Sequence, residues 1–413
     1  MSFLTYLSFR IGIIYENNNE ILISFIVIQF LIWSIFFFSK RKFFNIISYN
    51  IFFIIFLNLM LTPLFHLITF DVPTRLPNYE IAKDYKGKFF SGMLTGTHFI
   101  SYDEKGYRTN KKIDYNNKNK NTLRIFTIGA STTEEGEKGN NKIWSNLLGK
   151  NLEEFTNKNI EIVNSGVAGL RAEHHYITLK RIQKYKPDLI IFLMGINDWN
   201  DHIINNDIKY LIPTYEIKYN FKKSILFQTF GNINKQIKIK IFNKKNADDK
   251  KNINLLIPEQ DSEAYLLPQI DSLNKREIIK KFRPAMVSSD YQYWTNLIID
   301  ECKTGNLNCL FLDQPTAYKK NITNKLKERL WMTPPNQIYT LTLNDLIYTS
   351  SIYNGWLKKK ITDNKLNFCL LSDEIEPTTS FFFDDCHFTE NGSIKLADIL
   401  TNYINLNFKS VLN

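Results

Sequence analysis

From Leu123 onward the sequence alternates short apolar runs with longer amphipathic stretches, and this alternation constrains the fold more than any other feature. Apolar runs at residues 123–129, 160–166 and 188–195 have the length of buried strands. Between them, residues 133–155 predict a loop and an amphipathic helix, and residues 172–185 predict a second helix. Strands that alternate with helices favour a parallel sheet covered on both faces, so the sequence predicts an α/β domain.

The alternation is interrupted between about residues 200 and 288 and then returns. The interrupting segment is basic and polar and contains four prolines, so we interpret it as an insertion over the sheet edge. Beyond it, the pattern predicts a helix at residues 291–302, strands at 308–313 and 367–371, and a last helix at about 393–405. The predicted domain therefore spans about residues 121–408, and residues 71–120 form a linker and approach segment.

The first 70 residues have a different character and predict a membrane region. Residues 21–38 form an apolar run without a charge, close to the roughly 20 residues that a helix needs to cross a bilayer. A second, more diluted run follows from residue 43. We predict two retained transmembrane helices at about residues 21–39 and 43–65, because neither run has the small-residue cleavage site of a signal peptide. The alternative is a pair of buried core helices.

The basic cluster Lys40-Arg41-Lys42 lies between the two predicted spans and should stay on the cytoplasmic side. Both ends of the hairpin then face outward, which predicts a bacterial membrane-anchored protein with an extracytoplasmic domain. Arg75, Lys83 and Lys86 follow the second span closely and oppose this orientation. The lipid membrane is thus one expected partner.

Charge and cysteine content exclude several other classes of protein. The net charge is +11, but the lysines are dispersed along the chain and accompany no nucleic-acid-reading module, so no nucleic acid partner is expected. The four cysteines form no Cys-x-x-Cys pair, so no metal is expected. Outside the cytoplasm, Cys302 and Cys309 could form a disulfide, although four cysteines allow three complete pairings.

Small and polar residues follow the predicted strands, where a parallel sheet forms its ligand crevice. Ser131 follows the first strand and precedes a helix. Gly166 and Gly169 follow the second strand, and a glycine there lets a backbone N–H approach a ligand. Asn197 follows the third strand, where its amide N–H can bind an oxyanion. Each block alone is also typical of an ordinary turn.

A fourth block, Asp384-Asp385-Cys386-His387, precedes the last predicted helix. A serine hydroxyl needs a base that accepts its proton, and His387 can do this near neutral pH. Asp384, three residues earlier, can turn back to hold the imidazole N–H, whereas Asp385 is too close and is expected to point away. The four blocks together favour acyl transfer with Ser131 as the nucleophile.

These blocks resemble those of the SGNH (GDSL-like) hydrolase family. The family's four blocks match Ser131, Gly169, Asn197 and His387, and Asp384 fits its Asp-x-x-His. Residues 102–108 (YDEKGYR) are similar to the family's Asn-x-x-Gly-Phe-Arg segment, and residues 185–197 are similar to its third-strand region. The resemblance runs from about residue 101 to 406 without the insertion. It implies a flavodoxin-like three-layer sandwich with a central parallel sheet, the SGNH hydrolase fold.

The resemblance also implies a site and an activity. Ser131, His387 and Asp384 would form the catalytic triad, and Ser131, Gly169 and Asn197 the oxyanion hole, with no cofactor. Gly166 remains an alternative to Gly169. Ala130 departs from the aspartate or glycine that the family most often has there, and alanine should be tolerated because this residue only supports the turn.

The implied function is a membrane-anchored serine esterase that acts on O-acyl groups, chiefly O-acetyl groups, of a small molecule or of a cell-envelope or exported glycan. Two alternatives stay open: an O-acetyltransferase that moves the acyl group to a sugar hydroxyl, and a catalytically silent glycan-binding or assembly subunit. Adjacent His174 and His175 diverge on a helix and are expected to be surface or supporting residues rather than metal ligands. Trp199 is expected in the core, at the rim or in an acyl or sugar pocket.

Overall fold

The computed structural model describes residues 74–86 without Leu76, 94–205, 256–261, 278–331 and 337–412. All of them belong to one compact unit, formed by residues 72–209 and 254–413. The predicted spans at about 21–39 and 43–65 lie outside the described residues. Within the described part of the chain, every helix is too short or too polar to traverse a lipid bilayer.

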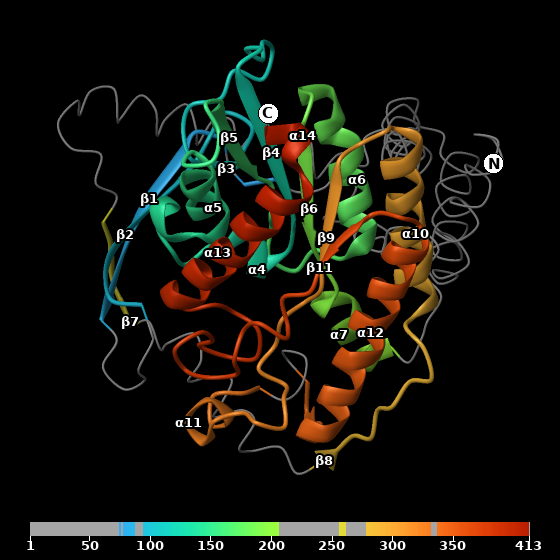
Figure 1. The fold of residues 1–413 in the computed structure, drawn as a ribbon. Helices are drawn as coiled ribbons and strands as arrows, with labels where there is room; N and C mark the ends of the chain where they lie inside the picture. The colour runs from blue at the N-terminus through green and yellow to red at the C-terminus, as the bar shows by residue number, and fades with distance from the viewer. Residues whose placement is uncertain are drawn as a thin grey trace, which may run out of the picture. The chain divides into compact units, whose positions relative to one another are not determined.

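A six-stranded sheet with the order β11-β9-β6-β4-β5-β3 lies at the centre of the unit (Figure 1). Its five parallel strands are β4 (Thr122–Gly129), β5 (Asn159–Asn164), β6 (Leu189–Leu193), β9 (Cys309–Leu312) and β11 (Asn367–Cys369). The short β3 (Arg108–Thr109) pairs antiparallel with β5 at the edge. The predicted parallel sheet is therefore confirmed, with one antiparallel edge strand added.

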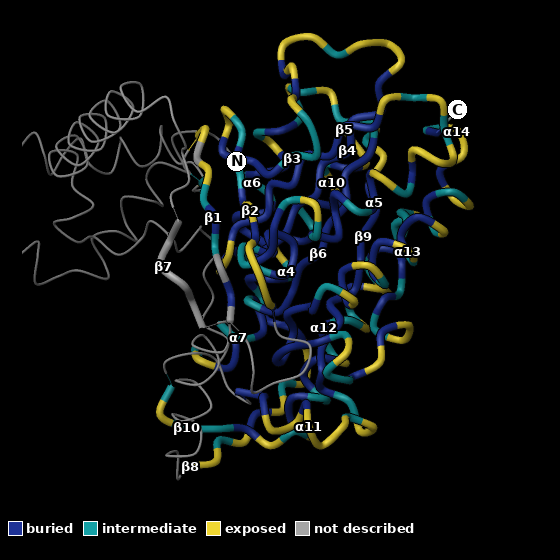
Figure 2. The backbone as a smooth tube through the Cα atoms, turned by 90° about the vertical axis from the view of Figure 1, so that its left-hand side faces the viewer, coloured by how far each residue is buried: buried dark blue, intermediate teal, exposed yellow. Residues whose placement is uncertain are grey.

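Two groups of helices cover the sheet. On one side α5 (Trp144–Leu152) packs against α13 (Glu390–Asn407), and on the other α6 (Ala172–Ile182) packs against α10 (Ser289–Thr304). Right-handed crossovers explain this division, because the chain moves from β4 to β5 in one direction and then returns past β4 to β6. All eight residues of β4 are buried between the layers, as the dark blue core in Figure 2 shows.

The change of direction at β4 positions the site. Because β5 and β6 flank β4 on opposite sides, the carboxyl end of β4 is a topological switch point, where ligands bind in open α/β sheets. The chain leaves β4 into the single turn of α4 (Ser131–Glu134). Opposite it, α7 (Ile196–Asn205) begins soon after β6 ends. The nucleophile candidate thus lies at the topological switch point of the sheet.

The chain outside this sheet is more structured than its sequence pattern predicts. In the segment 71–120, β1 (Tyr79–Lys86) pairs with β2 (Gly96–Tyr102), and β7 (Leu256–Asp261), from the segment predicted to be an insertion, joins β1 on its other side. The helix α7 continues past residue 200, where that insertion was placed. The sequence pattern also does not predict α12 (Leu343–Asp363), the longest described helix.

The remaining elements are short. They are η1 (Asn140–Lys142), η2 (Gln183–Tyr185), β8 (Ile278–Ile279), α11 (Asn324–Lys327), β10 (Tyr339–Thr340) and α14 (Lys409–Leu412). A disulfide joins Cys302 in α10 to Cys309 in β9, whereas Cys369 and Cys386 are buried free thiols. All four cysteines are among the described residues. The structure therefore contains one disulfide, between Cys302 and Cys309, and no complete pairing of the four.

Candidate active site

Ser131 is presented by a turn that only small residues can form. A Cβ atom at Gly129 would lie 2.0 Å from Thr133 Oγ1 and 2.5 Å from the Leu193 carbonyl oxygen, so a larger residue there would push the turn off β6. Ala130 is buried at the start of α4, where its methyl group is accommodated. Ser131 itself is partly exposed at the first position of the helix.

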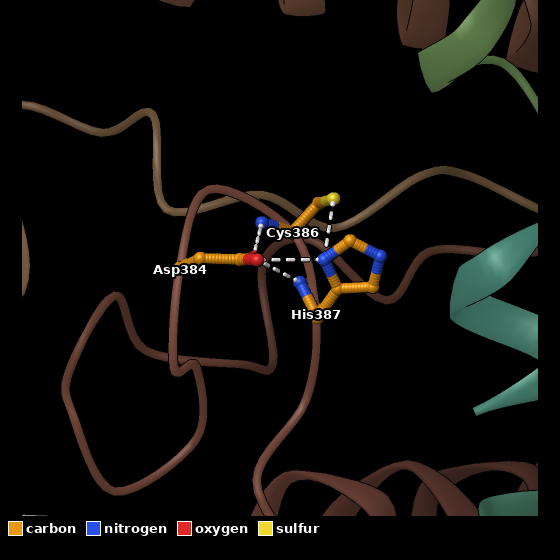
Figure 3. Close-up of side chains that lie close together, drawn as sticks. All are labelled: Asp384, Cys386 and His387. Carbon is orange, nitrogen blue, oxygen red and sulfur yellow. Dashed lines mark hydrogen bonds and ion pairs between the residues drawn. The ribbon is translucent and has the colours of Figure 1, made fainter. Parts of the chain in front are cut away.

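The structure brings Ser131, His387 and Asp384 together. His387 Nε2 lies 2.8 Å from Ser131 Oγ, and His387 Nδ1 lies 2.7 Å from Asp384 Oδ2. Asp384 is fully buried, and its other oxygen accepts the backbone N–H groups of Cys386 and His387 at 2.9 and 2.8 Å (Figure 3). Because a carboxylate only accepts, Nδ1 carries the imidazole proton and Nε2 is left to accept the serine proton.

Asp385 points away from the imidazole and has a structural role. Its two oxygens accept the Tyr318 hydroxyl and the Trp331 backbone N–H, both at 2.6 Å. Trp331 and Phe383 flank the His387 ring, with ring centroids 5.9 and 5.6 Å from it. Asp385 therefore fixes part of the wall beside the imidazole. The sequence pattern does not point to these two aromatic residues.

Cys386 completes a group of potential metal ligands with Asp384 and His387, since their donor atoms lie within 4.8 Å of one another. The Cys386 sulfur lies 3.7 Å from His387 Nδ1 (Figure 3). Burial raises the pKa of the Cys386 thiol to about 11, so the group is a neutral thiol near pH 7. The imidazole Nδ1 and the carboxylate are already bonded to each other, so the geometry suits proton transfer better than metal binding.

Of the two glycines after β5, Gly169 has the properties of an oxyanion donor. Gly166 is buried, donates its N–H to Asn164 Oδ1 at 2.9 Å and packs so closely on α4 that a Cβ atom would lie 2.5 Å from the Glu134 nitrogen. Gly169 is exposed, adopts a φ of +82° and has open space where a Cβ would be. Gly166 thus shapes the turn, and Gly169 remains the candidate donor.

Asn197 lies in the first turn of α7 and contacts the Gly169 loop. Its Nδ2 donates to the Leu170 carbonyl oxygen at 2.9 Å. An amide nitrogen carries two hydrogens, so the second one remains to bind an oxyanion. The contact with Leu170 fixes the direction of the amide.

We expect Asn197→Ala to lower kcat by about 10²- to 10³-fold with little change in KM, because an oxyanion donor acts mainly in the transition state. Steady-state kinetics on a soluble acetyl ester measure this effect. Asn205→Ala is the matched control, since Asn205 lies at the far end of α7 and bonds Asp201 at 2.9 Å. Equal losses in the two variants would remove Asn197 from the oxyanion hole.

A buried ionic network behind the site is absent from the sequence predictions. Arg108 is 1% exposed and donates to the carbonyl oxygens of Glu134 and Glu135, both at 2.7 Å, which closes the end of α4. The buried pair Glu135 and Lys138 continues the network, and Lys138 Nζ donates to the Phe388 carbonyl oxygen at 2.8 Å. The turn that carries Ser131 is thereby tied to the residue that follows His387.

The paired histidines are buried, which overturns the surface alternative and leaves that of supporting residues. His174 and His175 are 2% and 1% exposed on α6, and burial lowers the pKa of each to about 3, so both are neutral at physiological pH. His174 Nδ1 accepts the Arg171 N–H at 3.2 Å at the start of the helix. Trp199 is 1% exposed and packs edge-on against Tyr353, so it belongs to the core rather than to a substrate pocket.

Two buried carboxyl groups near α7 make stability depend on pH. Burial raises the pKa of Asp198 to about 7 and that of Asp290 to about 8, well above the ordinary value near 4. Both groups are neutral in the folded protein at mildly acidic pH. The stability that they contribute is complete below about pH 4 and is lost as the pH rises through 7 to 8.

We therefore expect Asp198→Asn to become more stable relative to the wild type as the pH rises from 5 to 8, with the difference in unfolding free energy growing by roughly 2–4 kcal/mol. Asparagine cannot ionise and retains an oxygen for the Ala172 N–H, which Asp198 accepts at 3.0 Å. Urea unfolding at several pH values measures the difference. The same pH dependence in both proteins would contradict the prediction.

The sheet order and the position of Ser131, Asn197 and His387 at its edge have the architecture of an α/β SGNH hydrolase. A family model described as GDSL-like Lipase/Acylhydrolase matches residues 125–400, and the chain belongs to this family. No curated protein matches the chain.

Solved structures resemble the chain only distantly. An acetyl xylan esterase is 12% identical to this chain. The match covers 68% of this chain and 100% of the esterase, with a TM-score of 0.38. An acetylxylan esterase from Geobacillus stearothermophilus is 12% identical, with coverages of 68% and 94% and a TM-score of 0.36. An esterase from Pseudoalteromonas sp. is 10% identical, with coverages of 69% and 98% and a TM-score of 0.35. Because these sequence identities and TM-scores are low, the chain is assigned to its family by the family model alone.

Proposed function

We propose that this chain is a serine esterase that hydrolyses O-acyl groups, with O-acetyl esters of a cell-envelope or exported glycan as its substrates. One observation carries the proposal: Ser131 Oγ, His387 Nε2, His387 Nδ1 and Asp384 Oδ2 form a continuous relay with contacts of 2.8 and 2.7 Å. The membership of the GDSL-like lipase/acylhydrolase family supports the ester as the bond that is cleaved.

In the proposed mechanism Ser131 Oγ attacks the ester carbonyl carbon while His387 Nε2 accepts the hydroxyl proton. Asp384 stabilises the imidazolium, and the backbone N–H groups of Ser131 and Gly169 and the Asn197 amide bind the oxyanion. The bond to the sugar oxygen then breaks, and His387 returns its proton to that oxygen. Water repeats the sequence on the acyl-enzyme and releases the free acid and Ser131.

An O-acetyltransferase would use the same residues and would differ only in the second step, where a sugar hydroxyl replaces water. The purified protein separates the two outcomes when it is incubated with a chromogenic acetyl ester, with and without an oligosaccharide acceptor. Release of acetate at the same rate in both reactions supports the esterase. Formation of acetylated oligosaccharide, with a matching decrease in released acetate, identifies a transferase. Failure to turn over any acetyl ester, with measurable oligosaccharide binding, identifies a silent binding subunit and overturns the proposal.

We also propose that the protein is anchored in a bacterial cytoplasmic membrane through residues 21–39 and 43–65, with the catalytic domain outside the cytoplasm. The apolar composition of these segments and the basic cluster between them support the anchor. The disulfide between Cys302 and Cys309 supports an oxidising compartment. Protease treatment of spheroplasts that leaves the catalytic domain intact would contradict this orientation.

A further inference from the structure

The carboxylate of Glu134 lies between the turn that carries Ser131 and the loop that carries Gly169. Glu134 is 1% exposed, and its Oε2 accepts the Ala168 backbone N–H at 2.8 Å. Glu134 is also the last residue of the single turn of α4, which begins at Ser131. One carboxylate therefore connects the nucleophile's own turn to the residue that precedes Gly169.

The Gly169 loop is held at two points, one on each side of the candidate oxyanion donor. Glu134 accepts the N–H of Ala168, and Asn197 donates to the carbonyl oxygen of Leu170 at 2.9 Å. Gly169 lies between these contacts with a φ of +82° and is exposed. Glycine is the most mobile residue in a chain, so the direction of its N–H depends on the contacts of its two neighbours.

Arg75 holds the Glu134 carboxylate from the other side. Its Nε and Nη2 donate to the two carboxylate oxygens at 2.5 and 2.7 Å, a bidentate pair that fixes the carboxylate plane. The Tyr102 hydroxyl donates to Oε1 at 3.1 Å. Burial of an unpaired carboxylate is costly, so the guanidinium is what permits this acceptor to lie beside the loop.

The backbone around Arg75 is itself fitted to the domain. A Cβ atom at Gly106, where φ is +78°, would lie 2.2 Å from the Arg75 carbonyl oxygen, so only glycine allows this approach. The Asn78 N–H donates to the Asp103 carbonyl oxygen at 2.8 Å. The Arg75 side chain is 42% exposed, whereas the side chain of its partner Glu134 is 2% exposed. The pair thus connects a surface segment to the interior of the site.

We propose that Glu134 is a positioning residue for the oxyanion hole and that Arg75 is its required counter-ion, so that the Arg75–Glu134 pair sets the direction of the Gly169 N–H. This inference rests on the proposed esterase function. Glu134 and Arg75 do not touch the reacting atoms and act through Ala168. Misplacement of a donor by about an ångström costs as much as 10²-fold in rate, so the expected effects are large.

Kinetics of Glu134→Gln, Arg75→Ala and Arg75→Lys test the role. We expect kcat to fall by about 10- to 100-fold in the first two variants with KM within threefold of the wild type, because an oxyanion donor acts in the transition state. Arg75→Lys should recover part of the loss, since lysine supplies the charge without the bidentate geometry. Lys111→Ala is the matched control, because it removes a surface ion pair with Glu153 at 3.1 Å.

Hydrogen exchange gives a readout that does not need turnover. In Glu134→Gln and Arg75→Ala, amides in residues 166–171 should exchange at least about fivefold faster, while the rest of the domain and the Lys111→Ala control match the wild type. Unchanged kcat and unchanged exchange overturn the inference, and so does faster exchange throughout the domain, which would show a general loss of stability. A wild-type protein without esterase activity would refute the proposed function instead, and the exchange result would still decide whether Glu134 positions the loop.

Discussion

Replacement of Ser131 with alanine should lower the turnover of an acetyl ester by at least about 10⁴-fold and abolish labelling by a fluorophosphonate probe. The serine oxygen is the only protein atom in the proposed scheme that forms a bond to the acyl group, so the acyl-enzyme cannot form without it. His387 lies 2.8 Å from this oxygen and would face a methyl group in the variant. The residual rate should reflect binding and the oxyanion hole alone.

Two measurements make this result specific to the nucleophile. Thermal unfolding should be close to that of the wild type, because Ser131 is partly exposed and alanine suits a helix start that uses no side-chain cap. Ser351→Ala is the control, since Ser351 is an exposed serine in α12 whose hydroxyl bonds the Tyr348 carbonyl oxygen. Labelling that persists in Ser131→Ala would assign the nucleophile to another residue.

Asp384→Asn should lower kcat by about 10⁴-fold while the fold is retained. An asparagine amide that faces His387 Nδ1 would donate to it, and the imidazole would then carry its proton on Nε2. In that tautomer the imidazole cannot accept the proton of Ser131. Asparagine still has one oxygen for the backbone N–H groups of Cys386 and His387, so the turn itself should persist.

Asp385→Asn is the matched comparison and should show the opposite pattern. Both Asp385 oxygens accept hydrogen bonds, from Tyr318 and Trp331. An amide there loses the charge-assisted character of both bonds and obliges the Tyr318 hydroxyl to turn round and accept. We expect a loss of about 1–3 kcal/mol in unfolding free energy with kcat within about tenfold of the wild type. Urea unfolding and steady-state kinetics on both variants distinguish the roles. A larger kcat loss in Asp385→Asn than in Asp384→Asn would exchange the two assignments.

The sequence contains enough information to predict the sheet and the residues at its edge. β6 is a continuous apolar run and β4 and β5 are mostly apolar, because parallel strands are buried on both faces. Ser131, Gly169 and Asn197 each lie a few residues after one of these strands ends, so their convergence follows from the topology of a parallel sheet. His387 lies just before a helical pattern, and this position identifies it as the remaining member of the site.

Other features could not be predicted because their signals depend on tertiary contacts. The buried face of α12 includes Thr349 and Ser350, and Gly355 lies within the helix, so its apolar periodicity is weak. Arg108, Glu135 and Lys138 are charged residues that a sequence analysis would place on the surface. They are buried only because segments far apart in the chain supply their partners. His174 and His175 are neutral because the tertiary fold buries them.

The separation of Ser131 and His387 by 256 positions has a consequence for biosynthesis. The ribosome completes β4, β5 and β6, and with them the nucleophile and the candidate oxyanion donors, long before it adds the base. Only when α13 packs on α5 does the imidazole arrive beside the hydroxyl. A nascent chain therefore carries an inert serine until the segment that contains His387 has been synthesised and has packed beside it.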